Sequence, residues 1–168
     1  MTLEAQAAEQ RGYRLLRYAC ILYIVGFALH TADHFRRGTD TLTPEVFWLA
    51  GVANVVGVIV IALVFTGHSL APLAAVVKGF TSAILFAAVH FLPEWSAFSD
   101  AFPGGAERGV EATSWAGALI EIAGLLALGA AGTHLLMNRS RRSGLAPGTA
   151  SSGAFSGHVR NAKGGESP

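Results

Sequence analysis

Residues 115–137 read WAGALIEIAGLLALGAAGTHLLM, an apolar run in which Glu121 is the one charged residue. About 20 mostly apolar residues are enough for a helix to cross the ~30 Å hydrocarbon core of a bilayer. A helix also satisfies its own backbone hydrogen bonds in lipid, and the run lacks the alternation of a strand. This stretch therefore predicts a transmembrane helix.

Three further stretches of the same character precede it, at residues 15–35, 46–66 and 72–92. The whole chain of 168 residues is 52% hydrophobic and 14% charged, against about 25% charged residues in an average soluble domain. Its single cysteine excludes an internal disulfide framework and a cysteine-rich zinc site. We therefore predict an all-α fold, a membrane-spanning four-helix bundle over residues 15–137 with a disordered C-terminal tail.

The segments outside the spans predict the orientation. Arginines cluster before the first span and after the last one, and Lys and Arg collect on the cytoplasmic side of membrane proteins. We expect a protein of the plasma membrane with a cytoplasmic N-terminal segment at residues 1–14 and a disordered cytoplasmic tail at residues 138–168. Arg36 and Arg37 fall on the outer side in this arrangement and count against it, but they are outnumbered.

Polar residues of the four spans fall in one layer. The first and third spans run outward and carry His30, His34 and His90 near their outer ends. The second and fourth spans run inward and carry Asn54 and Glu121 about two turns below the outer face. Ionisable groups inside a span are costly, so each of them is a functional candidate. Helical spacing also places His30 and His34 on one face of their helix.

Imidazole and carboxylate groups together suit a transition metal, and four-helix bundles build such sites from facing side chains. Asp33 or Asn54 could hold the second nitrogen of an imidazole. The predicted metal ligands are the residues His30, His34, His90 and Glu121.

Three other interpretations of this layer stay open. His30 or His34 could pair with His90 as the axial ligands of haem b. The same polar groups could instead hydrogen-bond to one another across helices and hold the bundle together. Glu121 beside histidines could also change its charge near neutral pH and relay protons or ions.

Several functions are compatible with these features. The chain could bind a metal or haem for redox chemistry or metal handling, act as an accessory or assembly subunit of a larger membrane complex, or serve as a small proton-coupled transporter, in the last case as a homodimer. It shows no nucleophile or phosphate-binding motif, so the sequence predicts no reaction. Nucleic-acid binding is not expected, because the basic residues are terminal and lack interleaved aromatics. Lys78 is expected to snorkel to the cytoplasmic face.

Overall fold

The computed structural model of the protein describes residues 3–144 and is all-helical over that range, as predicted. Its four helices are α1 (Leu3–Arg37), α2 (Pro44–Thr66), α3 (Ala71–His90) and α4 (Ala112–Gly144). Two short 3₁₀ turns, η1 (Thr39–Thr41) and η2 (Gly105–Arg108), lie in the connections from α1 to α2 and from α3 to α4. Each of the four helices is long and apolar enough to cross a membrane.

Both terminal helices are longer than their predicted spans. Helix α1 begins at Leu3, so most of the predicted N-terminal segment continues the helix, because it is rich in Ala, Glu, Gln and Arg, which are good helix formers. Helix α4 continues to Gly144 and therefore includes residues 138–144 of the predicted tail. The prediction of disorder was wrong for these residues. The rest of the predicted disordered tail, residues 145–168, lies outside the described residues.

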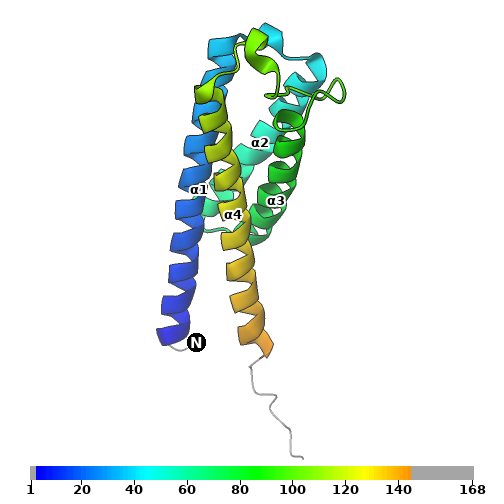
Figure 1. Ribbon diagram of the computed structural model, residues 1–168. Helices are drawn as coiled ribbons and strands as arrows, with labels where there is room; N and C mark the ends of the chain where they lie inside the picture. The colour runs from blue at the N-terminus through cyan, green and yellow to red at the C-terminus, as the bar shows by residue number, and fades with distance from the viewer. Residues whose placement is uncertain (1–2, 145–168) are drawn as a thin grey trace, which may run out of the picture.

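Helices α1 and α4 lie side by side along most of their length, and α3 packs on the other side of α4 (Figure 1). Glycines allow this close approach, as is common between transmembrane helices. A Cβ on Gly26 would lie 2.4 Å from Glu121 Cα, and one on Gly124 would lie 2.5 Å from Tyr23 Cα. Helix α2 packs mainly on α3 and has few contacts with α1.

The two ends of the bundle differ in character. Toward the termini the core is apolar and includes the fully buried side chains of Leu16, Leu128 and Leu135. At the opposite end the connection from α3 to α4 folds back over the helix ends. There, the amides of Asp100 and Phe102 donate to the carbonyls of Val89 and His90, at 3.0 and 2.8 Å. This return of the chain places Asp100 beside the histidines.

Candidate metal centre

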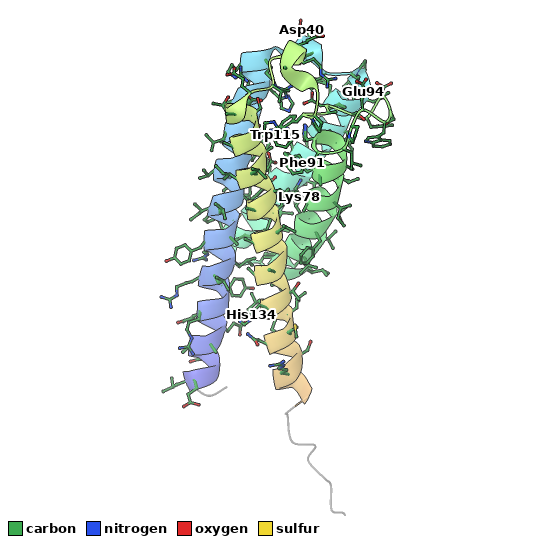
Figure 2. The ribbon with its side chains drawn as sticks, in the orientation of Figure 1. Asp40, Lys78, Phe91, Glu94, Trp115 and His134 are labelled. Atoms are coloured by element: carbon green, nitrogen blue, oxygen red, sulfur yellow. The ribbon has the colours of Figure 1, made fainter. Side chains whose placement is uncertain are left out.

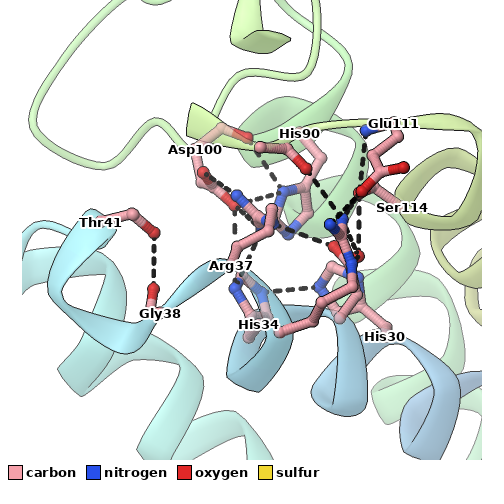
Figure 3. Close-up of polar contacts among 12 residues, drawn as sticks. His30, His34, Arg37, Gly38, Thr41, His90, Asp100, Glu111 and Ser114 are labelled. Atoms are coloured by element: carbon pink, nitrogen blue, oxygen red, sulfur yellow. Dashed lines mark hydrogen bonds and ion pairs between the residues drawn. The ribbon is translucent and has the colours of Figure 1, made fainter. Parts of the chain in front are cut away.

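Three imidazoles meet at the C-terminal ends of α1 and α3 (Figure 3). One nitrogen from each of His30, His34 and His90 lies within 4.8 Å of the other two. The ring centroid of His30 lies 4.5 Å from that of His34 and 4.7 Å from that of His90. His30 and His90 are buried, at 6% and 5% exposure. The structure thus brings together the three histidines that the sequence singled out.

Asp100 is the carboxylate next to these rings. The Nδ1 atom of His90 lies 3.1 Å from the Asp100 carbonyl oxygen and 3.4 Å from its Oδ2. The same Oδ2 lies 4.0 Å from His34 Nδ1. Burial by itself raises the pKa of the Asp100 carboxyl, but hydrogen bonds from His90 and Arg37 outweigh it and hold that pKa well below its usual range. Asp100 is therefore an anion that faces two imidazoles.

Arg37 fixes this carboxylate in place. Its side chain is fully buried and donates to both Asp100 oxygens at 3.2 and 2.8 Å, and to Asp33 Oδ2 at 2.9 Å. Arg36 donates to Asp33 and forms an ion pair with Glu111. The two arginines that counted against the predicted orientation are thus neutralised by acids of the same layer.

The hydrogen bonds determine which nitrogens carry protons. A guanidinium only donates, so His34 Nδ1, at 3.0 Å from Arg37, accepts. In the neutral ring the proton is then on Nε2, which donates to His30 Nε2 at 3.0 Å. The proton of neutral His30 is therefore on Nδ1, a buried atom with no hydrogen-bond partner among the described residues.

His90 donates through Nδ1 to Asp100, so its Nε2 offers a lone pair. The Nε2 lone pair of His30 accepts from His34 and becomes available to a metal when His34 gives up that proton. For His34 to bind a metal through Nε2, its proton has to move to Nδ1, where Asp100 rather than Arg37 can accept it. A carboxylate that accepts from a metal-bound imidazole is a common arrangement in metal sites. Asp100 already accepts from His90, whereas its Oδ2 lies 4.0 Å from His34 Nδ1 and has to move closer to accept from that ring.

The other predicted site residues lie apart from this group. Glu121 is buried at 6% exposure, but the set of nitrogens within 4.8 Å does not include it. Gly117 faces the His30 backbone and Gly26 faces Glu121, so the acid lies about one helical turn, or ~6 Å, deeper. Asn54 approaches from α2 and lines the cavity described below.

Asp33, the second expected partner of an imidazole, is instead bound to arginines and to Ser114, whose hydroxyl donates to it at 2.9 Å. Asp100 takes the role that the sequence analysis gave to Asp33 or Asn54. The one available signal for Asp100 was that it is an acid in the connection between the third and fourth spans, and helical spacing cannot locate a loop residue.

A cavity of about 310 Å³ lies below the imidazoles and is lined by residues of all four helices. Lys78 lines its deep end and does not snorkel, contrary to expectation. The side chain is 7% exposed, its Nζ donates to the Ala53 carbonyl at 2.8 Å, and it lies 5.8 Å from the Tyr23 ring centroid (Figure 2). The expectation failed because this face of α3 points into the bundle.

The geometry does not suit a bis-histidine haem. The rings of His30 and His90 are in edge-to-face contact, and Phe86 lies 4.8 and 4.5 Å from them, which leaves no space for a porphyrin between the two rings. His134 lies toward the opposite end of the bundle (Figure 2) and is hydrogen-bonded to Asn138.

No family model, curated protein or solved structure matches the chain, so the chemistry of the site has to be inferred from its own geometry.

Proposed function

We propose that this membrane protein binds one transition metal ion through His30, His34 and His90. The observation that carries the proposal is the convergence of three ring nitrogens within 4.8 Å in a largely buried place. Imidazole ligands suit zinc, copper, iron and nickel. Each of these ions binds the neutral ring, which is the form that the hydrogen bonds of His30 and His34 require.

The pattern of hydrogen bonds favours a metal site over a purely structural cluster. A structural cluster would link different helices through its imidazoles. Here His30 bonds to His34 of the same helix, and His90 bonds to the loop that directly follows its own helix. Three rings are therefore gathered without being used to hold α1 and α3 together. A cation bound by all three imidazoles would connect α1 with α3.

Three protein ligands leave an open coordination position, which is typical of catalytic rather than structural zinc sites. Both His30 and His90 line the cavity, so a small molecule in the cavity could approach that position. A bound ion would supply Lewis acidity or an activated water there. The protein's own contribution is to orient the rings, through Asp100 and Arg37, and to limit the access of water by burial.

Metal analysis of the detergent-purified protein tests the proposal. We expect about one transition metal ion per chain, and after removal of the metal we expect Co²⁺ to bind and give the visible absorption of a site with nitrogen ligands. His30→Ala and His90→Ala should each lower metal affinity at least tenfold, because two imidazoles remain of three. His134→Ala is the matched control, since this histidine lies outside the cluster.

Two results would contradict metal binding by the three histidines. Failure of Zn²⁺, Cu²⁺, Ni²⁺ and Co²⁺ to bind the folded protein at micromolar concentration would exclude the proposed site. Equal loss of metal in the His134→Ala control and in the cluster variants would show that binding is not specific to the three histidines.

The proposal places the metal centre on the outer side of the plasma membrane, with both termini cytoplasmic. The arginines that precede the first span and follow the last one support this orientation, because they outnumber Arg36, Arg37 and Arg108 at the other end and Lys and Arg collect on the cytoplasmic side. An impermeant maleimide added to whole cells should label Ala97→Cys in the exposed outer loop and should miss Gln10→Cys on α1. Labelling of Gln10→Cys alone would invert the orientation.

A further inference from the structure

We propose that the cavity below the histidines binds a lipophilic phenol, with its hydroxyl group held by Glu121 and Lys78. Both residues line the inner part of the cavity, and neither belongs to the three-histidine group. The inference therefore does not require a bound metal, and it adds an organic ligand to the proposed metal site.

Glu121 supplies an acceptor without a partner. Its side chain is 6% exposed, and its Oε2 is enclosed and unbonded among the described residues. A carboxyl group inside a membrane protein is costly unless it is paired or hydrogen-bonded. Buried polar groups are nearly always satisfied, so an unsatisfied one needs an explanation. A ligand group that donates a hydrogen bond to Glu121 would provide it.

Lys78 supplies N–H donors for a ligand. The ammonium group has three N–H donors, and one of them goes to the Ala53 carbonyl at 2.8 Å. Lys78 and Glu121 interact electrostatically, but they do not form an ion pair with each other within the described part of the chain. A free donor and a free acceptor thus border the same space. A hydroxyl oxygen serves both, because it accepts from Lys78 and donates to Glu121.

The rest of the cavity selects the body of the ligand. Its walls include the aromatic rings of Tyr23, Phe27 and Phe86, which favour an aromatic ligand through ring contacts. A volume of about 310 Å³ is at the small end of the range for ligand pockets. Phe35 and Phe47 line the cavity and are also 73% and 52% exposed, so it opens toward the surroundings of the bundle. A small lipophilic phenol dissolved in the bilayer fits these conditions.

Equilibrium binding of 4-butylphenol to the protein in nanodiscs tests the inference, with 4-butylanisole as the matched ligand. The methyl ether keeps the ring and chain but lacks the O–H donor. We expect the phenol to bind at least tenfold more tightly than the ether. Glu121→Leu and Lys78→Met should each reduce this preference to below threefold, whereas Ser82→Ala, on the same cavity wall, should retain it.

The same measurement on chelator-treated protein separates this site from the metal centre. The preference for the phenol should persist there, whether or not the untreated protein holds metal. Equal binding of phenol and ether to the wild-type protein would overturn the inference, as would an unchanged preference in both variants.

A second measurement does not depend on the folding of variants. A photoreactive diazirine phenol should label wild-type residues of the cavity wall, such as Phe27 and Phe86, in preference to Trp48 and Val55 on the exposed face of α2. Labelling spread evenly over exposed side chains would indicate partition into lipid only and would also overturn the inference.

Discussion

The two sides of the histidine cluster are built in opposite ways. On one side, α1 and α4 pack through glycines so closely that an added methyl group at Gly26 would collide with backbone. On the other side, α2 leaves a cavity and has few contacts with α1. In the most apolar stretch of each helix, 44% of α4 residues are buried but only 17% of α2 residues are. The candidate ligands come from α1 and α3, the two helices that pack most extensively on α4.

This difference indicates a division of roles. Ligand side chains have to be held within a fraction of an ångström, and the α1–α4 contact together with the Arg37–Asp100 pair can do that. A small molecule that enters the cavity has to pass between helices, and α2 is the helix that is packed least tightly against the others. The free energy of unfolding in detergent measures how much each side contributes to the stability of the bundle.

The largest effect is expected from Asp100→Ala. This change leaves the fully buried Arg37 with one carboxylate partner, Asp33, instead of two. Breaking a buried ion pair costs about 3–5 kcal/mol, and because Asp33 remains we expect a loss of about 3 kcal/mol. Metal affinity should also fall 10- to 100-fold, as is usual when a partner of a metal-bound histidine is removed. Thermal unfolding and Co²⁺ titration measure the two effects.

Glu94→Ala provides the control for the same loop. Glu94 has a 70% exposed side chain and pairs with Arg108 at 3.5 Å, and exposed pairs contribute about 0–1 kcal/mol. An Asp100→Ala protein as stable as Glu94→Ala would show that the ion pairs of Arg37 with Asp33 and Asp100 do not hold the cluster.

Gly26→Ala should have the next largest effect, on the tightly packed side. The new Cβ would lie 2.4 Å from Glu121 Cα and 2.5 Å from its nitrogen, both of which are backbone atoms. Helices α1 and α4 would have to separate, and overpacking of this kind costs about 1–3 kcal/mol. We expect about 2 kcal/mol by thermal unfolding, together with weaker metal binding, because His30 lies one turn further along α1. A stable variant with unchanged metal affinity would argue against a rigid α1–α4 contact.

The helical architecture could be predicted because apolar runs of this length have few alternatives in a membrane. The ends of α1 and α4 could not, because the charged residues beyond each span are good helix formers and continue the helix outside the apolar part. His30 and His34 were found from their spacing of four residues, and His90 from its depth. Spacing and depth along a helix were thus sufficient to identify the three histidines.

Three features could not be predicted from spacing and depth. Asp100 lies in a loop, and its position depends on the return of the chain over the end of α3. Lys78 was misplaced because depth does not show which face of α3 meets lipid. Glu121 was assigned to the layer of the imidazoles, but the register of α4 against α1 puts it one turn below them. Each depends on contacts between elements rather than on the sequence of one element.

Lys78→Met should have a smaller effect, on the α2 side. The substitution removes the hydrogen bond from Nζ to the Ala53 carbonyl, which connects α3 with α2. Hydrogen bonds from charged groups contribute about 1.5–3 kcal/mol, but the change also removes a buried charge, so we expect a net loss of about 1 kcal/mol. Thermal unfolding measures the effect. No loss at all would favour a lysine that extends to the membrane surface, and the solvent accessibility of Lys78→Cys would then be high.

Gly51→Ala should have the smallest effect, and its direction is the sharpest test of the comparison. A Cβ at Gly51 would meet no atom within 4 Å, in contrast to Gly26. Alanine is favoured over glycine in a helix by about 1 kcal/mol, so we expect thermal unfolding to show equal or slightly higher stability. The two glycine substitutions should therefore differ in sign although they are chemically identical. A clear loss of stability at Gly51 would mean that this face of α2 packs against another chain in the membrane, such as a second copy or a larger complex. A disulfide between two Gly51→Cys chains would then indicate a second copy, and its absence would indicate a larger complex.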